Sequence, residues 1–302
     1  MLDSILVGDN PFQGVSHVSG ERSRQRRKEV LTSDYAVSVL LAAFEAGAQG
    51  FAFSVADNTL RILKRAAETN RGLNLYPIVP AVTFYARQAS DPSSLVGYYV
   101  REVLRTMNPH LAIKTVVPIL NMDLARMLVS YLEWELLRIW RATNRQCNIK
   151  AILMHEIVTD LAIAFNAREI VMRFVRASTH DLKLLPGFVT RNLPFLVRRL
   201  EEWQIEPSDV VICAPFNKVG FQMNPSKEEC EQTLRKLPSC GIIAMSVFAG
   251  GYLRPAEAMA YINALPNIRS IIAGVSTVEQ AAETFAMLSQ SFSRSAGLWH
   301  NR

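Results

Sequence analysis

Short apolar runs alternate with amphipathic stretches along this chain, and the alternation repeats eight times. Several of the apolar runs carry no polar interruption, which is typical of parallel strands that are covered on both faces. The pattern therefore predicts eight strands, at residues 4–7, 50–54, 75–82, 149–154, 182–189, 210–214, 242–247 and 268–273.

Between the strands, apolar residues recur every three or four positions, which predicts amphipathic helices. One helix follows the candidate cap Ser33-Asp34 and ends at Gly47, and Asp57 or Asn58 is a candidate cap for the next one. Further helices are predicted near residues 95–105, 123–141, 167–177, 193–203, 227–237, 255–264 and 277–288.

Eight strand–helix units in 302 residues amount to about 38 residues each, which is normal for a closed (β/α)₈ barrel. We therefore predict the α/β class and a single TIM-barrel domain over residues 1–302. A doubly wound open sheet is the alternative. No GxGxxG motif follows the first strand and no Pro/Ser-rich linker divides the chain, and both observations favour the barrel.

Two connections are longer than the usual 2–6 residues of a βα loop. They span residues 9–33 and 83–148 and leave the carboxyl ends of the first and third strands. Barrel active sites lie at that end. The sequence thus predicts enlarged first and third βα loops, which serve as functional lids or are poorly ordered.

The strand ends supply the candidate catalytic residues. His155 closes the apolar run 151–154, so strict alternation predicts that it points into the barrel and that Glu156 points away. Imidazole suits proton transfer near neutral pH. Ser54, Asp57 and Asn217 are candidate polar supports for it. The alternatives are a buried structural histidine at 155 and a helix cap at 57.

The last two strands end in glycines, at Gly250, Gly251 and Gly274, and the final one leads through Ser276 and Thr277 into a helix. Glycines allow close approach of backbone N–H groups to a ligand, and a helix N-terminus favours an anion. These five residues predict a phosphate or carboxylate site, unless they only form turns and caps. Further candidate ligand-binding residues at other strand ends are Asp9, Asn10, Arg191 and Lys218. The alternatives to ligand binding are that Asp9 only forms a turn and that Lys218 is a solvated loop residue.

The net charge is +6, and half of it comes from residues 21–29, which hold five basic and two acidic side chains. This segment is either a solvated face or a cationic lid over a small anionic molecule. Nucleic-acid binding is disfavoured, because no aromatic residues are interleaved with the charges. No HxH, HExxH or paired-carboxylate spacing predicts a metal site.

Composition narrows the class of protein further. Hydrophobic residues make up 49% and charged residues 20% of the chain, which excludes a disordered protein. No uncharged apolar stretch reaches the ~18 residues of a membrane span. The first residues show no basic signal-peptide region, and the four cysteines form no CxxC. We therefore expect a cytoplasmic protein.

Four segments resemble the aldo-keto reductase barrel, at residues 46–54, 152–155, 186–192 and 273–280. The resemblance implies a barrel fold and an Asp, Tyr, Lys and His tetrad that acts with NADP(H). Here only His155 matches the tetrad. The aspartate position falls on Ser54 and the tyrosine position near Thr59, and residues 77–82 hold no lysine. The resemblance therefore implies the fold and a nucleotide or phosphate pocket, without the usual reduction.

The leading hypothesis is an enzyme that binds a small anionic or phosphorylated ligand at the strand ends, with His155 as the acid–base group. The first alternative is an NADP-dependent oxidoreductase with a rearranged proton donor. The second is a non-catalytic ligand-binding or assembly protein, in which the helix at 123–141 forms a homo-oligomer. A metal-dependent lyase or hydrolase is the least favoured.

Overall fold

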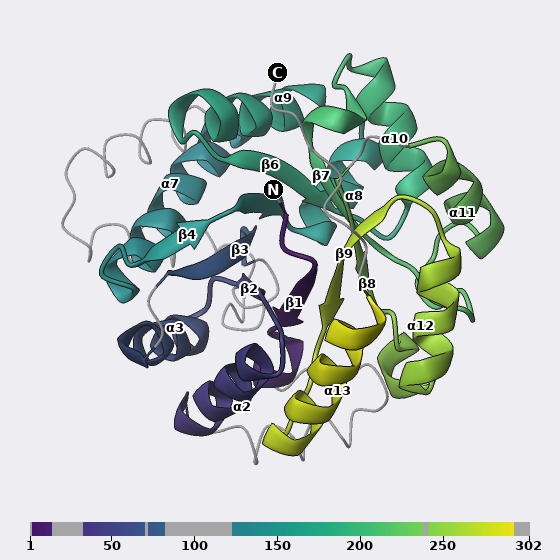
Figure 1. The fold of residues 1–302 in the computed structure, drawn as a ribbon. Helices are drawn as coiled ribbons and strands as arrows, with labels where there is room; N and C mark the ends of the chain where they lie inside the picture. Colours follow the sequence, from purple (N-terminus) through teal and green to yellow (C-terminus); the bar gives the residue numbers. More distant parts are fainter. Residues whose placement is uncertain (1, 14–32, 70–71, 82–122, 238–240, 293–302) are drawn as a thin grey trace, which may run out of the picture.

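The described strands form a closed parallel barrel (Figure 1). The computed structural model describes residues 2–13, 33–69, 72–81, 123–237 and 241–292. β1 pairs with β2 on one side and with β9 on the other, and this second pairing closes the sheet. The strands are β1 (Ile5–Gly8), β2 (Gly50–Ser54), β3 (Leu73–Val79), β4 (Cys147–Ile149), β5 (Ala151–Met154), β6 (Leu185–Val189), β7 (Val211–Pro215), β8 (Gly241–Met245) and β9 (Ile268–Ala273).

β4 and β5 occupy one position of the barrel, because both pair with β3. Leu73 is opposite Cys147 and Ile78 is opposite Leu153, so the register shifts by one residue at Lys150. One extra residue in one strand is the mark of a β-bulge. The barrel therefore has eight strand positions, as predicted, and the predicted fourth strand is divided at the bulge.

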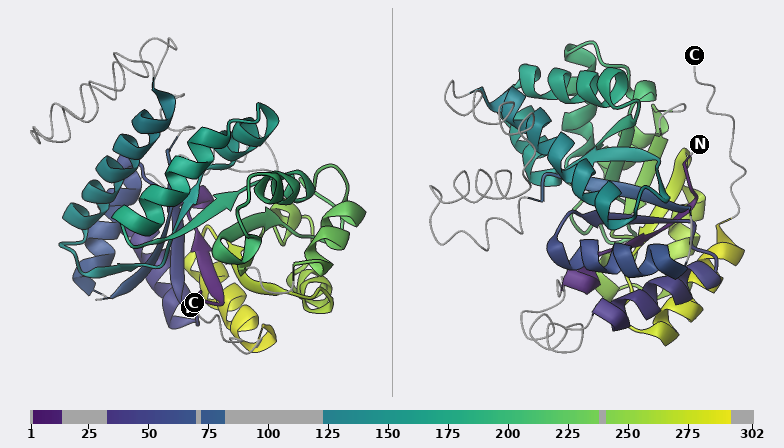
Figure 2. Two further views of the ribbon diagram at one scale, coloured as in Figure 1. Left: turned by 90° about the horizontal axis from the view of Figure 1, so that it is seen from above. Right: turned by 90° about the vertical axis from the view of Figure 1, so that its left-hand side faces the viewer.

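Helices surround the barrel on its outer side, as Figure 2 shows in two further views. They are α2 (Ser33–Glu45), α3 (Asp57–Thr69), α7 (Leu124–Ala142), α8 (Glu156–Ala164), α9 (Arg168–Arg176), α10 (Leu193–Glu202), α11 (Lys227–Arg235), α12 (Pro255–Ala264) and α13 (Val278–Ser291). The predicted helices are confirmed with shifted ends, except the one near 95–105, which lies outside the described residues. The sequence prediction missed α8.

The core has two layers that follow the alternation of the strands. In β5, Ile152 and Met154 pack against the surrounding helices, whereas Ala151 and Leu153 fill the barrel with residues such as Tyr76. The filling is tight. A Cβ atom at Gly187 of β6 would lie 2.4 Å from Cδ2 of Leu153. The barrel is therefore a packed core that supports a site at its end.

The predicted long loops are only partly described. The first begins with a short 3-10 helix, Asn10–Gln13, which is held to α3 because Asn58 Nδ2 donates to the carbonyl of Phe12 at 3.2 Å. The second contains α7 and β4. Residues 14–32 and 82–122 lie outside the described part, so the lid stays a prediction. None of the described helices has the length and the hydropathy of a membrane span.

Candidate functional site

A cavity of about 960 Å³ opens at the carboxyl ends of the strands, near the upper end of the range for ligand pockets. Its floor is apolar, since it is formed where Ile78, Val189, Met245 and Ile272 end the packed interior. Polar groups surround this floor. The cavity is where the predicted site residues His155, Ser54, Asp9, Asn10, Arg191, Gly250, Gly251, Gly274, Ser276 and Thr277 come together.

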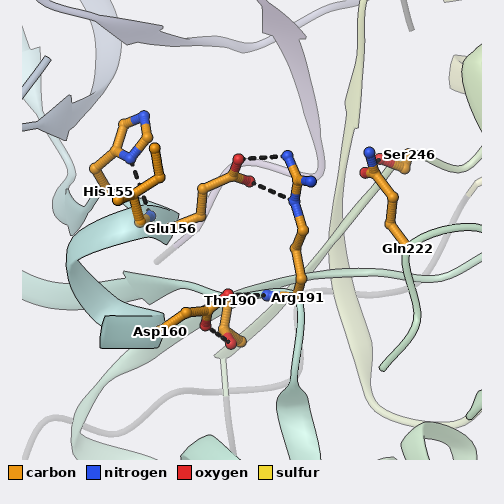
Figure 3. Close-up of polar contacts among 8 residues, drawn as sticks. His155, Glu156, Asp160, Thr190, Arg191, Gln222 and Ser246 are labelled. Atoms are coloured by element: carbon orange, nitrogen blue, oxygen red, sulfur yellow. Dashed lines mark hydrogen bonds and ion pairs between the residues drawn. The ribbon is translucent and has the colours of Figure 1, made fainter. Parts of the chain in front are cut away.

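His155 lies between the end of β5 and the start of α8. Its N–H donates to the carbonyl of Val79 at 2.7 Å, and its side chain caps α8 because Nδ1 accepts the N–H of Ile157 at 3.1 Å (Figure 3). A backbone N–H can only donate, so the neutral ring carries its proton on Nε2. Burial lowers the pKa of His155, and the nearby Glu156 and Arg191 have smaller, opposing effects. The imidazole is therefore a neutral donor at neutral pH.

The prediction that Glu156 points away from His155 is wrong, because the strand ends at Met154 and α8 begins at Glu156. Both side chains line the cavity. Glu156 forms a two-point ion pair with Arg191, in which Nε donates to Oε2 at 3.2 Å and Nη2 donates to Oε1 (Figure 3). The positive charge of Arg191 is thus balanced within the site.

Asp160 of α8 holds the backbone that carries Arg191. Its Oδ1 accepts the hydroxyl of Thr190 at 2.6 Å, and its Oδ2 accepts the N–H of Arg191 at 3.2 Å. Burial raises the pKa of Asp160, and the hydrogen bond from Thr190 opposes the shift. Two side chains of one helix therefore fix Arg191, one through its guanidinium and one through its backbone.

Gln222 and Ser246 lie on the far side of Arg191 in Figure 3, and the remaining amino group of the guanidinium points toward them. Ser246 Oγ donates to Gln222 Oε1 at 3.3 Å. Both residues have positive φ angles, 62° and 54°. Such angles are uncommon outside glycine and cluster at functional sites. The sequence analysis missed both, because a backbone angle has no clear mark in a single sequence.

Asp9 follows β1 and is only 5% exposed. Its Oδ2 accepts the N–H of Ser54 at 2.9 Å and Nε2 of Gln13 at 3.5 Å. Gln13 also donates to the buried hydroxyl of Thr59. Burial raises the pKa of Asp9 to about 7, and these hydrogen bonds only oppose that shift. Ser54, at the position that the resemblance gives to an aspartate, thus supplies a backbone donor to a different carboxyl group.

The glycine loops line the cavity as predicted, but they have structural reasons of their own. Gly250 and Gly251 have φ angles of 71° and 97°. A Cβ at Gly274 would lie 3.1 Å from the ring of Pro11, a close approach that glycine allows without displacing the ring. In contrast, nothing lies within 4 Å of a Cβ built at Gly251, which leaves that backbone open to the cavity.

The N-terminus of α13 already has its own hydrogen-bond partners. Thr277 Oγ1 accepts the N–H of Gln280 at 3.2 Å, and Gln280 Oε1 accepts the N–H of Ser276 at 3.2 Å. This reciprocal cap occupies two of the amides that an anion would use. Glu283 of the same helix also lines the cavity. The described contacts therefore favour an anion-binding site at Arg191 over one at the N-terminus of α13.

Three predicted residues do not line the cavity. Asp57 begins α3 and pairs with Arg138. Asn217 is buried and holds its own loop, since it bonds the N–H and the carbonyl of Phe221 at 2.7 and 2.8 Å. Lys218 pairs with Glu257 at the surface. We find no described contact between His155 and either Asp57 or Asn217, which were expected to support it. Lys218, which was expected to bind ligand, lies outside the cavity.

The charges around the cavity bear on the NADP that the resemblance implies. Among the described residues, Arg191 is the sole cation of the lining, and Asp9, Glu156 and Glu283 are acidic. Cations and free backbone amides favour nucleotide phosphates. Among the described residues the lining offers them one cation, Arg191, whose charge Glu156 already balances. The basic segment 21–29 lies outside the described residues. No cluster of three metal-binding side chains occurs in the described part.

Solved structures with a similar fold include several aldo-keto reductases. A Pseudomonas aeruginosa protein assigned as an aldo-keto reductase has a TM-score of 0.58, with 14% identity over 95% of this chain and 90% of its own. The fold is that of the aldo-keto reductases. A glycerol dehydrogenase from Gluconobacter oxydans has a TM-score of 0.55, with 11% identity over 96% of this chain and 86% of its own. An aldo-keto reductase from a deep-sea metagenome library of the Medee basin has a TM-score of 0.51, with 11% identity over 95% and 86%.

The resemblance seen in the sequence is thus confirmed for the fold, a barrel of the kind that aldo-keto reductases have. The chain matches no family model and no curated protein sequence. Identities of 11–14% establish architecture rather than reaction. The chemistry must be argued from the cavity, where His155 stands with Ser54, Asp9 and Arg191 in place of a complete tetrad.

Proposed function

We propose that this protein is an enzyme that binds a small anionic molecule in the cavity, with His155 as its acid–base group. The reductase-like barrel supports an enzyme with its site at the strand ends. The observation that carries the proposal is the state of His155. Nδ1 is engaged by Ile157, and no described residue bonds Nε2, so the ring can give a hydrogen bond or a proton to a bound oxygen.

Arg191 supports the anionic part of the proposal. Two of its guanidinium nitrogens bind Glu156, and the third has no bond to another described residue. Its side chain is 37% exposed, so a ligand can reach it. Because Glu156 balances the charge, we expect a single carboxylate or phosphate group to bind moderately, with the remainder of the ligand extending toward His155.

Isothermal titration calorimetry with inorganic phosphate and with acetate tests the binding. We expect Arg191→Gln to weaken binding about tenfold or more, because a charge-assisted hydrogen bond is lost. Lys218→Gln is the matched control, since Lys218 is paired at the surface outside the cavity. Equal binding by both variants and the unmodified protein would overturn the anion site.

The role of His155 is tested by proton exchange. The unmodified protein and His155→Asn are incubated in D₂O with glyceraldehyde, dihydroxyacetone and the phosphate of each, and loss of the C–H signals is followed by ¹H NMR. An acid–base role predicts a rate lower by about 10²–10⁴ in the variant. Unchanged exchange in His155→Asn would remove His155 from the mechanism.

An NADP-dependent oxidoreductase with a rearranged proton donor is the second candidate, and the likeness to reductase barrels favours it. Titration with NADPH, followed by its fluorescence, distinguishes the two candidates. No change at near-millimolar NADPH supports the first candidate, and saturable binding supports the second. Stable oligomers that bind phosphate but cause no exchange would instead favour a ligand-binding or assembly role. A cytoplasmic location stays a prediction.

A further inference from the structure

We infer that Asp9 is the catalytic base of this cavity and that the substrate is a small carbonyl compound with a hydrogen on the neighbouring carbon. This inference rests on the proposed function and extends it. Asp9 and His155 reach the same cavity from different barrel strands, β1 and β5, with β2 and β3 between them. The inference requires a substrate that contacts both groups, each from its own side of the cavity.

The need for a second group follows from the hydrogen bonds of His155. Nδ1 accepts a backbone N–H, and the neutral ring holds its proton on Nε2. In this tautomer Nδ1 is engaged and Nε2 holds a proton, so the ring acts on a substrate oxygen as a donor and is not placed to take the first proton from a substrate carbon. A reaction that begins with removal of a proton requires a base elsewhere in the cavity.

Among the described ionisable groups of the lining, Asp9 alone suits that task. Glu156 is held in the ion pair with Arg191. Glu283 lies exposed on α13. Burial raises the pKa of the Cys213 thiol, so it stays protonated. Asp9 is buried and has no described cation paired with it.

The two carboxylate oxygens of Asp9 have different surroundings. Oδ2 is fixed by the Ser54 N–H and by Gln13. No other described residue bonds Oδ1, and Asp9 lines the cavity, so Oδ1 is the oxygen to which we assign the proton transfer. The residues around Asp9 from β2, from the 3-10 helix and from α3 are the uncharged Ser54, Gln13 and Thr59, and burial raises its pKa to about 7. A base performs best when its pKa lies near the working pH.

The step transfers one proton and needs no oxidant. Oδ1 of Asp9 takes the proton from the carbon beside the carbonyl group. The C–H electron pair forms a carbon–carbon double bond, and the carbonyl π electrons move onto the oxygen. That oxygen is stabilised by the Nε2–H of His155, as a neutral imidazole donor can do. Return of a proton from Asp9 to the same carbon, or of a deuteron after Asp9 has exchanged with D₂O, re-forms the carbonyl compound and completes an exchange.

Deuterium exchange tests this assignment with the same four probes, glyceraldehyde, dihydroxyacetone and their phosphates. Asp9→Asn keeps the shape of the side chain and removes the base, and Asp57→Asn is the matched control at a carboxylate outside the cavity. We expect Asp57→Asn to keep the exchange rate and Asp9→Asn to lower it about 100-fold or more. We also expect the rate of the unmodified protein to rise with pH until Asp9 is ionised.

The outcomes separate the two proposals. Full exchange by Asp9→Asn together with loss in His155→Asn overturns the role of Asp9 and leaves the proposed function standing. Full exchange by both variants overturns both. If the unmodified protein exchanges none of the four probes, the substrate class is wrong, and phosphate calorimetry judges the proposed function alone. A ¹³C NMR titration that finds the Asp9 carboxyl ionising near pH 4 would also overturn the inference.

Discussion

The backbone N–H of Ile157 donates to Nδ1 of His155 at 3.1 Å, so the first turn of α8 fixes the tautomer of the histidine that precedes it. This single bond gives the end of β5 two functions. It satisfies a helix N-terminus that lacks a Ser, Thr, Asp or Asn cap, and it leaves the Nε2–H of a neutral ring in the cavity.

The charged neighbours of His155 predict how its pKa responds to substitution. Burial keeps that pKa below 6.5, Glu156 raises it and Arg191 lowers it. We therefore expect Glu156→Gln to lower the pKa further and Arg191→Gln to raise it. A ¹H–¹³C NMR titration of the imidazole ring measures both shifts. Shifts of the opposite signs would show that these charges do not act on the ring as the geometry requires.

Glu156 also predicts the strength of anion binding. Its carboxylate occupies two guanidinium nitrogens of Arg191. Glu156→Gln releases that charge, and we expect inorganic phosphate to bind about three- to tenfold more tightly, with the gain decreasing at high salt. Glu257→Gln is the control, since it frees Lys218 outside the cavity. A gain of equal size in both variants would indicate a nonspecific effect of net charge.

The barrel could be predicted from the sequence because each strand is an apolar run whose two faces are both covered, and that pattern survives without knowledge of contacts. α8 was missed for a local reason. It begins directly after β5, and its cap is His155, which is not among the residue types that mark a helix start. The misplacement of Glu156 followed from the same error, because a strand continued by one residue reverses the direction of a side chain.

The candidate site was predicted as a set of strand ends, but not as contacts. The pair of Glu156 and Arg191 joins residues that are 35 positions apart and depends on where β5 stops. Asp9 stands in an Asp-Asn-Pro sequence that suits an exposed turn equally well, so its burial could not be inferred. Asp57 and Lys218 follow strands as predicted, yet they pair with Arg138 and Glu257 and do not line the cavity.

Gly187 tests the tight filling of the barrel. A Cβ there would lie 2.4 Å from Cδ2 of Leu153 and 2.9 Å from the carbonyl oxygen of Val211. We expect Gly187→Ala to lower the free energy of unfolding by about 1–3 kcal/mol through overpacking. Gly251→Ala is the comparison, because its Cβ meets open space and only the positive φ opposes it, at a cost of about 1–2 kcal/mol. Urea denaturation measures both. No loss in Gly187→Ala would mean that β6 can shift away from β5.

Because burial raises the pKa of Asp9, this residue makes the folded protein less stable as the pH rises. The pKa is about 7 in the folded protein against a model value of 3.8. Between these values the folded state holds a proton that the unfolded state has released, so folding becomes less favourable as pH rises from about 4 to about 7. Above pH 7 the loss in the free energy of unfolding that Asp9 causes reaches its full size, with an upper limit on the order of 4 kcal/mol.

Asp9→Asn removes this titration while its amide oxygen can still accept the Ser54 N–H. We therefore expect the variant to equal the unmodified protein near pH 3.5 and to be more stable at pH 8, with the gap opening between those values. Urea denaturation across that range measures it. Asp57→Asn removes a half-exposed carboxylate from its ion pair with Arg138, and its effect on stability should not change between pH 5 and pH 8. A gap that is constant with pH would show that folding does not shift the pKa of Asp9, and its role as a base with a pKa near neutral pH would then have no support.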